Sequence, residues 1–353
     1  MTTAPRHLPL AGARERRLPV LVHGAGSVGL WVGGHLAAAG WAVSFVGRAE
    51  RLRPLAALGL TLTDLEGARR HVAPAALTLA EQLDELDLAR RPPALTLLCV
   101  KGGATAAAAA ELAQALPPGS LVLSLQNGVG NAELAREHAP GLTWLAGMVA
   151  CNIAELVPGQ LHRGTAGALA AQQHAALLPW VDWFAAAGLP LALHDDMPAV
   201  LWAKLMLNLN NPVNALSGLP LRAELLDRGF RHCYAALVDE ALGLMSLAGI
   251  VPARITPLPM ARLPALLRLP TPLFRLVAAR LLRIDPHARS SMADDLARRR
   301  PTEVDLLAGE VVRLAHRLGR TAPLNARICE LVDRQPRPGQ PRSSQELIRE
   351  LGL

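Results

Sequence analysis

Two lysines, Lys101 and Lys204, stand out because every other residue among the chain's 36 Lys and Arg is Arg. Arg serves as well as Lys wherever a surface only needs positive charge, but it stays protonated at any working pH. A buried Lys can have its pKa lowered and can exchange a proton. The scarcity of Lys therefore makes both residues candidates for chemistry that Arg cannot supply, with chance survival as the alternative.

Lys204 begins a polar stripe in a segment whose other residues are mostly Leu and Met. Lys204, Asn208 and Asn211 are spaced i, i+4, i+7, which places them on one face of a helix. A buried polar stripe must be hydrogen-bonded, and a substrate that carries a carboxylate would satisfy it. The alternative is the wet face of an amphipathic helix. Pro212 cannot donate to the Asn208 carbonyl and should kink the chain there.

A glycine-rich turn lies between an apolar strand, 18–23, and a helical pattern that continues to Ala39. The turn reads Gly24-Ala25-Gly26-Ser27-Val28-Gly29. In a GxGxxG turn the first Gly permits the tight bend, the second lets a pyrophosphate approach the backbone, and the third allows close helix packing. The strand-turn-helix context favours dinucleotide binding over a glycine-rich turn without a ligand.

The end of the second expected strand, 41–46, bears on which dinucleotide is bound. NAD sites place an Asp or Glu at this tip for the ribose hydroxyls, whereas here Arg48 follows the strand. Arg48 can pair with the 2′-phosphate of NADP, and Arg51 or Arg53 can assist. A solvated Arg48 is one alternative, and the nearby Glu50 keeps NAD open as another. The charge balance favours NADP.

Lys101 and Asn127 each follow an apolar strand, 95–100 and 121–125 respectively. Open α/β sheets bind their ligands at the carboxyl ends of the strands. Lys101 can therefore reach a phosphate or a ribose, and Asn127 can offer a donor and an acceptor near a nicotinamide. Ordinary turn chemistry is the alternative for both, because Asn127-Gly128 is a good turn dipeptide.

The alternation of helices with apolar strands predicts an α/β fold: an N-terminal Rossmann-like, doubly wound parallel sheet followed by an all-α C-terminal domain. We expect an NADP-binding Rossmann domain over 17–194 and a helical substrate-binding and catalytic domain over 195–334. A disordered leader over 1–16 and a tail over 335–353 are expected at the two ends.

Within the second domain, long helical segments are expected at 197–216, 230–248 and 301–318. The Pro-rich stretch 252–286 is expected to form broken helices or a long loop packed on that domain. The segment 335–344 is rich in Pro, Arg and Ser and is expected to be irregular.

Composition argues against several classes of protein. The net charge of +7 is spread along the chain and aromatic residues make up only 3%, so nucleic-acid binding is not indicated. No uncharged run is long enough to cross a bilayer, and the first residues lack the apolar core of a secretory signal. The four Cys form no CxxC pair, so no metal site is predicted and a reducing cytoplasm is the simplest compartment.

Two further polar positions have ordinary explanations. Glu303 follows Pro301-Thr302 at an expected helix start, where the helix dipole favours an acid without any function. Ser290 and Ser291 can be N-caps of the segment that follows them. The residues alone therefore assign no role to Glu303 or Ser291.

Taken in order, these motifs resemble the ketopantoate reductase (2-dehydropantoate 2-reductase) family over about 18–332. The matching pieces are the glycine-rich turn, Val100-Lys101, Asn127-Gly128, Trp202-x-Lys204-Leu205-x-x-Asn208, Ser291-Met292 and Arg299-Arg300-Pro301-Thr302-Glu303. The ordered combination is specific, whereas no single piece is.

The resemblance implies an NADPH-dependent reductase in which Lys204 is the general acid that protonates the ketone oxygen. It implies that Glu303 contacts both the substrate hydroxyl and the cofactor, and that Asn208 and Ser291 hold the substrate. Cofactor contacts are implied for Lys101, Asn127 and the backbone at Ile153.

The chain departs from the family pattern at two places. The family commonly has a second Asn eight residues after the Lys, where this chain has Pro212, and Asn211 is the expected replacement. The stretch 252–286 is longer than in compact members. Both departures bear on the substrate more than on the type of reaction.

We therefore expect NADPH-dependent reduction of a 2-oxo acid, with 2-dehydropantoate reduced to (R)-pantoate, for pantothenate and coenzyme A synthesis, as the first choice. A sister reductase for another 2-oxo or β-hydroxy acid and a non-catalytic NADP-sensing module are the alternatives. The expected partners are the small-molecule substrate and, as a possible homodimer, a second copy of the chain.

Overall fold

The computed structural model describes residues 18–279, 282, 284–335 and 340–353, so the expected leader 1–16 lies outside it. Its main sheet has eight strands. They are β1 (Pro19–His23), β2 (Ala42–Val46), β5 (Thr78–Ala80), β6 (Leu95–Leu98), β7 (Leu121–Ser124), β8 (Thr143–Val149), β11 (Leu169–Gln172) and β12 (Leu191–His194).

The strand order of the main sheet is β12-β11-β8-β7-β6-β1-β2-β5. The six strands from β5 to β8 are all parallel, while β11 pairs antiparallel with β8 and parallel with β12. Counted along the chain, those six follow the order 3-2-1-4-5-6 of a Rossmann sheet, whose direction of winding reverses between β1 and β6. The predicted parallel Rossmann-like sheet is confirmed.

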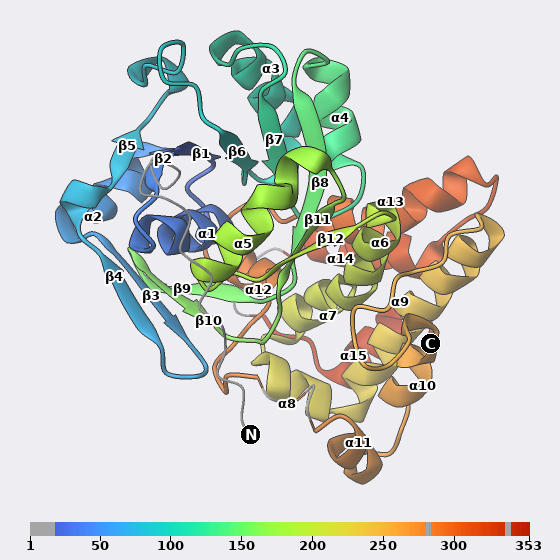
Figure 1. Cartoon of the computed structure of the whole chain (residues 1–353). Coiled ribbons are helices and arrows are strands. Elements are labelled where there is room, and N and C mark those ends of the chain that lie inside the picture. The colour runs from blue at the N-terminus through green and yellow to red at the C-terminus, as the bar shows by residue number, and fades with distance from the viewer. Residues whose placement is uncertain (1–17, 280–281, 283, 336–339) are drawn as a thin grey trace, which may run out of the picture.

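Helices cover both faces of this sheet, as a doubly wound fold requires (Figure 1). They are α1 (Ser27–Ala38), α2 (Ala49–Leu58), α3 (Thr105–Ala115), α4 (Asn131–His138) and α5 (Leu178–Ala186), with 3₁₀ turns η2 (Pro74–Ala76), η3 (Leu83–Glu85), η4 (Gly102–Ala104) and η5 (Ala175–Leu177). Alternate residues of β1 enter opposite cores: Val20 and Val22 pack with α1 and α5, and Leu21 packs with α3 and α4. This period of two explains why the strand is apolar throughout.

A second sheet, which the sequence analysis did not predict, lies against α1 (Figure 1). Its strands are β3 (Leu60–Asp64), β4 (Arg69–Val72), β9 (Ile153–Val157) and β10 (Gln160–Arg163), in the order β4-β3-β10-β9. The central pair, β3 and β10, is parallel and joins segments about 100 residues apart. Leu60, Leu62 and Leu161 from this sheet share one buried core with α1.

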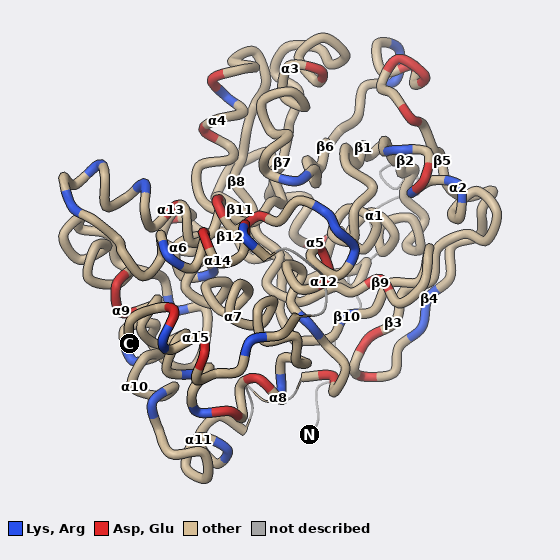
Figure 2. Tube along the Cα trace, turned by 180° about the vertical axis from the view of Figure 1, so that it is seen from behind, with Lys and Arg blue, Asp and Glu red and all other residues tan. Residues whose placement is uncertain are grey.

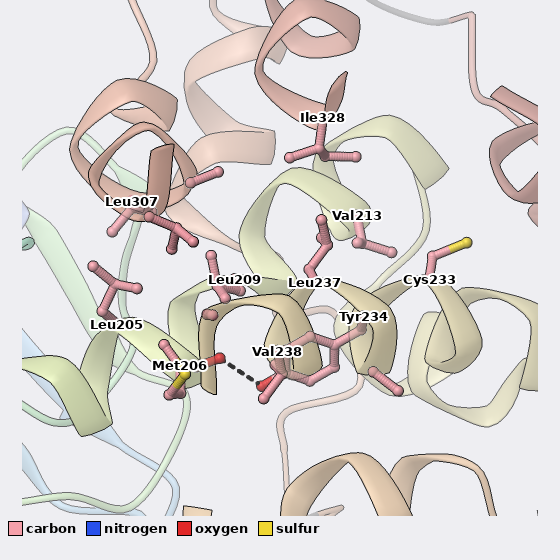
Figure 3. Close-up of a cluster of buried hydrophobic side chains, with 14 of the residues drawn as sticks. Leu205, Met206, Leu209, Val213, Cys233, Tyr234, Leu237, Val238, Leu307 and Ile328 are labelled. Atoms are coloured by element: carbon pink, nitrogen blue, oxygen red, sulfur yellow. Dashed lines mark hydrogen bonds between the residues drawn. The ribbon is translucent and has the colours of Figure 1, made fainter. Parts of the chain in front are cut away.

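Every described element after β12 is helical, as expected. The helices are α6 (Met197–Asn208), α7 (Asn210–Ser217), α8 (Leu221–Leu226), α9 (Arg228–Leu247), η6 (Met260–Arg262), α10 (Leu263–Leu267), α11 (Thr271–Val277), α12 (Ser291–Ala297), α13 (Val304–Arg317), α14 (Pro323–Asp333) and α15 (Ser344–Leu351). Their shared core is apolar and centres on α6, α7 and α9 (Figure 3). Tyr234 of α9 donates its buried hydroxyl to the Met206 carbonyl of α6 at 3.1 Å.

The described part of 252–286 forms short helices packed on the helical core, as predicted. Its anchor is Arg231 of α9, which is fully buried and lies 4.3 Å from the centre of the Phe274 ring. The Arg231 guanidinium donates to the carbonyls of Leu267 and Leu269, each at 2.9 Å. At the end of the chain, α15 begins at the last residue of the segment expected to be irregular, and its Leu347 is buried in the same core.

Surface charge and membrane propensity raise no further candidate sites. Lys and Arg are distributed over both the sheet region and the helical region (Figure 2). None of the described helices combines the length and apolar character needed to span a membrane. Among the described residues, no group of three or more His, Cys, Asp or Glu side chains is placed to hold a metal ion.

Candidate active site

Helix α6 carries Lys204 and Asn208 one turn apart, so their side chains share a face. The helix is interrupted at Leu209, and Asn211 belongs to the next helix, α7. Pro212 explains the interruption, because it cannot donate to the Asn208 carbonyl. Asn211 therefore lies beyond a one-residue interruption of the helix, and its place on the same face as Lys204 and Asn208 stays a prediction. The Asn211 backbone carbonyl accepts from the Ser290 hydroxyl at 3.3 Å.

A chain of contacts joins α6 to the carboxyl ends of two strands. Asn208 Nδ2 donates to Asn127 Oδ1 at 3.4 Å, and Asn127 Nδ2 donates to Glu303 Oε2 at 3.4 Å. The other oxygen of Glu303 accepts from the Gly102 backbone N–H at 3.1 Å. Asn127 follows β7 and Gly102 follows β6, so three residues predicted from distant motifs meet where the sheet meets the helical region.

Glu303 reaches this position because α13 starts directly on the two loops. A Cβ atom at Gly102 would lie 2.2 Å from Cδ1 of Leu306, so a larger residue there would require the Leu306 side chain to move. Glu303 is the N-cap residue of α13 but makes no capping hydrogen bond with its side chain. Its carboxylate therefore does not cap its own helix, and its neighbours come from the sheet domain.

Lys204 points to the end of a third neighbouring strand. Its Nζ donates to the carbonyl of Ala150, directly after β8, at 3.3 Å. Burial lowers the pKa of the Lys204 ammonium from its ordinary value, and the nearby Cys151 acts weakly in the other direction. Burial also raises the pKa of the Cys151 thiol. A cation with a lowered pKa on the same helix face as the Asn208 amide is suited to donate a proton to a developing oxyanion.

The backbone of the glycine-rich turn fits a dinucleotide, as the space around each Gly Cα indicates. A Cβ at Gly24 would lie 2.5 Å from the Cys99 carbonyl carbon, and Gly24 has φ of 113°, so the bend itself requires Gly. A Cβ at Gly26 would meet only the Cys99 carbonyl oxygen, at 3.9 Å. The protein leaves open space over Gly26, which is the room that a pyrophosphate needs. Gly26 begins α1 without a side-chain cap, so the helix N-terminus faces that space.

The arginines after β2 differ in availability. Arg48 is exposed and lies 3.4 Å from Glu50, a weak surface pair. Arg51 is committed elsewhere: its guanidinium pairs with the buried carboxylate of Glu155, and its Nε donates to the Ala25 carbonyl at 3.2 Å. Arg51 is thus not free to assist with a 2′-phosphate, which corrects that expectation. Arg48 and the exposed Arg53 remain as candidates.

Lys101 is held by the helical region. Its Nζ lies 2.8 Å from the Asp295 carboxylate and donates to the Pro301 carbonyl at 2.7 Å. Asp295 lies in α12, and Pro301 lies between α12 and α13. A cofactor contact from Lys101 therefore requires it to share or release Asp295.

The remaining predicted positions lie apart from this cluster. Ser290, not Ser291, is the N-cap of α12, where its hydroxyl accepts from the Ala293 N–H at 3.1 Å. Ser291 is the first residue of that helix and is exposed. Ile153 begins β9 and pairs with Arg163 in the second sheet.

A buried polar network supports the site and was missed at the sequence level. Gln126 Nε2 donates to the Val100 carbonyl at 3.0 Å and to Thr105 Oγ1 at 2.8 Å. Asn131 Nδ2 donates to the Asn127 carbonyl at 2.8 Å. These bonds tie the loops after β6 and β7 together. The available signal was Gln126 itself, a polar residue directly after an apolar strand.

A Rossmann-type sheet whose carboxyl edge, with Asn127, meets Lys204 and Asn208 from a helical region defines a class of two-domain oxidoreductases. The profile described as ketopantoate reductase PanE/ApbA matches residues 20–175, and the profile of its C-terminal part matches residues 196–335. The chain belongs to the ketopantoate reductase PanE/ApbA family, and it is an oxidoreductase of that type.

Individual relatives agree with this assignment. The 2-dehydropantoate 2-reductase of Halobacterium salinarum is 30% identical over 335 residues, which cover 91% of this chain and 99% of that protein. The crystal structure of a PanE/ApbA family ketopantoate reductase from Ralstonia eutropha has a TM-score of 0.73 at 29% identity and covers 90% of this chain and 97% of that one.

A ternary structure of D-mandelate dehydrogenase with NADH and anilino(oxo)acetate has a TM-score of 0.72 at 20% identity, covering 90% of this chain and 97% of that one. At this identity the likeness concerns the fold alone. The fold therefore occurs in proteins named for different substrates.

Proposed function

We propose that this protein reduces the ketone of a 2-oxo acid with NADPH, and that 2-dehydropantoate, reduced to (R)-pantoate, is its substrate. The observation that carries the proposal is the contact chain from Asn208 through Asn127 to Glu303, one helical turn from Lys204. The similarity to proteins named 2-dehydropantoate 2-reductase supports the choice of substrate.

Lys204 is the general acid in this proposal. Bound NADPH supplies the hydride to the ketone carbon, and negative charge develops on the ketone oxygen. The Lys204 ammonium stabilises that charge and gives the oxygen a proton, which leaves a neutral amine. Burial favours the neutral amine after the transfer, as the lowered pKa indicates. An Arg at this position could stabilise the charge but not readily lose a proton.

Asn208 and Glu303 position the substrate in this proposal. Asn208 can donate to a substrate oxygen with the amide hydrogen that Asn127 does not use. Glu303 accepts from the substrate hydroxyl and faces the cofactor, as the resemblance implies. Asn211 and Ser291 stay predictions as substrate contacts, because neither side chain hydrogen-bonds to Lys204 or Asn208 in the structure, and Ser291 is exposed.

The proposed cofactor is NADP, bound by residues 24–29 and by the ends of β2, β6 and β7. Arg48 pairs with the 2′-phosphate, and Lys101, Asn127 and the Ile153 backbone contact the nicotinamide half. Residues 17–194 form the cofactor domain and residues 195–334 form the substrate domain. We propose a cytoplasmic location, and a homodimer that light scattering of the purified protein would test.

The test is oxidation of NADPH by the purified protein with a panel of 2-oxo acids that includes 2-dehydropantoate. The proposal expects 2-dehydropantoate to give the highest kcat/KM and NADPH to be preferred over NADH. A higher kcat/KM for another 2-oxo acid would instead identify a sister reductase. No oxidation with any acid, together with tight NADPH binding, would favour a sensing module.

A further inference from the structure

The backbone of Arg299 adopts a conformation that normally belongs to Gly. Arg299 is the one residue other than Gly with a positive φ in the described part of the chain, at 54°. Its N–H donates to the Leu296 carbonyl at 3.1 Å, and the next N–H, of Arg300, donates to the Asp295 carbonyl at 2.8 Å. This pair of bonds is a Schellman motif, which places the residue after the helix cap in the left-handed region.

The protein ends other helices in the same way, and there it uses Gly. Helices α1, α5, α9, α13 and α15 close with the same pair of backbone bonds. The residues at the left-handed position are Gly40, Gly188, Gly249, Gly319 and Gly352. An Arg in this position is strained because its Cβ crowds the backbone. Strain that a structure retains is a reason to look for a use of the side chain.

The loop that carries Arg299 is bound to the cofactor domain on both sides. Before it, the Arg298 guanidinium donates to the Glu155 carbonyl of β9 at 3.3 Å. After it, the Pro301 carbonyl accepts from Lys101, which follows β6, at 2.7 Å. Arg299 therefore lies on a bridge from the helical region to the sheet domain.

The two attachment points flank the glycine-rich turn. The Glu155 carboxylate pairs with Arg51, and Arg51 Nε donates to the Ala25 carbonyl within that turn. Lys101 follows β6, the neighbour of β1, and the turn follows β1. In a doubly wound sheet the crevice between these two strands receives the ligand. The middle of the bridge, where the exposed Arg299 side chain starts, lies between these two attachment points.

The glycine-rich turn and the N-terminus of α1 supply no full positive charge for a pyrophosphate. The N-terminus of α1 has no side-chain cap and no acidic residue in its first turn. It offers only partial positive charge and backbone N–H groups to a pyrophosphate. A guanidinium adds a full charge and a planar fork of donors that matches phosphate oxygens.

We propose that Arg299 of the helical region binds the pyrophosphate of the dinucleotide from the side opposite the glycine-rich turn. The inference rests on the proposed function, since it needs a dinucleotide at the turn. It adds a cofactor contact from the domain that also carries Lys204, so that dinucleotide binding holds the two domains together.

The test compares Arg299→Gly and Arg299→Lys with the wild type by isothermal titration calorimetry. The probes are NADPH, NADH, ADP-ribose and adenosine 2′,5′-bisphosphate. ADP-ribose keeps the pyrophosphate but lacks the nicotinamide and the 2′-phosphate, whereas adenosine 2′,5′-bisphosphate lacks the pyrophosphate. Arg299→Gly should weaken binding of the first three about tenfold or more, the loss of one charge-assisted hydrogen bond. Binding of adenosine 2′,5′-bisphosphate should not change. Arg299→Lys should fall between, because it keeps the charge without the fork.

A melting curve separates binding from folding. Arg299→Gly should melt at the same temperature as the wild type or higher, because Gly removes the strain. The control is Arg320→Ala, which removes an exposed Arg directly after the equivalent Gly319 of α13 and should leave every Kd unchanged.

Three results for Arg299→Gly would overturn the inference. The first is unchanged binding of ADP-ribose. The second is weakened binding of NADPH alone, which would assign Arg299 to the 2′-phosphate, and the third is weakened binding of all four probes with a lowered Tm. A wild type that binds neither NADPH nor NADH would instead refute the proposed function, and this inference with it.

Discussion

Asn127 uses both ends of its amide to join the two halves of the site: its Oδ1 accepts from Asn208, 81 positions away, and its Nδ2 donates to Glu303. The orientation of the amide is thus fixed by its partners, since Glu303 as a carboxylate can only accept. Asn127, which the sequence also allowed as a simple turn residue, therefore lies where α6, α13 and the sheet meet.

The first prediction replaces the Asn127 amide, which donates to Glu303, by a carboxylate, which can only accept. Asn127→Asp should lower the free energy of unfolding by about 1 to 3 kcal/mol at pH 7, because two carboxylates would then face each other without a donor between them. Adding Glu303→Gln should restore most of the loss, since the new amide can donate to Asp. Denaturant unfolding measures both, with Asn127→Ala as the control that removes the bonds without repulsion. No rescue by the second substitution would contradict the contact.

The second prediction concerns the protonation of Lys204. A general acid must be protonated, so kcat should fall as the pH rises through the Lys204 pKa. Burial lowers that pKa from its ordinary value of 10.5, so the fall should begin at a lower pH than an exposed Lys would give. Lys204→Arg should cut kcat by about 10² to 10⁴ and lose this alkaline limb, while the Kd of NADPH stays the same. Unchanged turnover in Lys204→Arg would refute the assignment.

The same shift affects stability in a definite direction. Because the folded protein disfavours the ammonium of Lys204, the unfolded chain binds that proton more tightly. The contribution of this group to stability therefore increases as the pH rises through its folded pKa toward the unfolded one. Activity and stability should consequently move in opposite directions with pH, which distinguishes loss of the acid from unfolding.

Local chemistry made much of the site predictable. Gly24 and Gly26 are dictated by a turn that only Gly can make or leave open, and Lys101 and Asn127 stand where apolar strands end. Lys204 and Asn208 follow from helical spacing within one turn. Each of these signals depends on residues a few positions apart, so the sequence contains all of it.

The parts that were missed depend on distant partners. The second sheet pairs β3 with β10, which are short strands that contain polar residues, and no local sequence pattern predicts this pairing. The sequence left Arg51 available for a phosphate, but its guanidinium pairs with Glu155, 104 positions away. For the second sheet and for Arg51, the deciding contact comes from elsewhere in the chain. Asn211 differs: its expected place assumed one helix through Leu209, where the structure instead ends α6 before α7 begins.

The third prediction concerns Glu224 of α8, a fully buried carboxyl that accepts from Asn210 Nδ2 at 2.9 Å. Burial raises its pKa to about 8, so it is protonated at neutral pH. The folded state thus holds a proton that the unfolded chain loses above its own value of 4.5, and stability should decline as the pH rises from about 4.5 to 8.

Glu224→Gln should remove this decline. The variant should match the wild type near pH 5 and exceed it in unfolding free energy near pH 9, because Gln stays neutral and keeps an acceptor for Asn210. Thermal melts across this range measure it, with the exposed Glu137→Gln as the control for a lost charge. Parallel pH profiles for Glu224→Gln and the wild type would rule out the shift.

The last prediction concerns the end of α6, on which the position of Lys204 depends. A helix leaves its final carbonyls without partners inside the helix. Here α6 ends at Asn208, and Leu209 is the residue that caps it. The buried Tyr234 hydroxyl donates to the Met206 carbonyl at 3.1 Å (Figure 3) and to the Leu207 carbonyl at 3.3 Å. Tyr234→Phe keeps the ring and removes only this hydroxyl. It should lower the unfolding free energy by about 1 to 3 kcal/mol, because buried acceptors lose their donor.

A purely structural loss and a shifted α6 can be told apart. If Tyr234 fixes the end of α6, Tyr234→Phe should also lower kcat at temperatures where the protein is fully folded, while the Kd of NADPH stays the same, since the glycine-rich turn is on another domain. Ser120→Ala removes an exposed hydroxyl that donates to the Pro117 carbonyl at 2.7 Å. Because water can replace that donor, it should change neither stability nor kcat. Equal effects from the two substitutions would show that the Tyr234 bond does not set the end of α6.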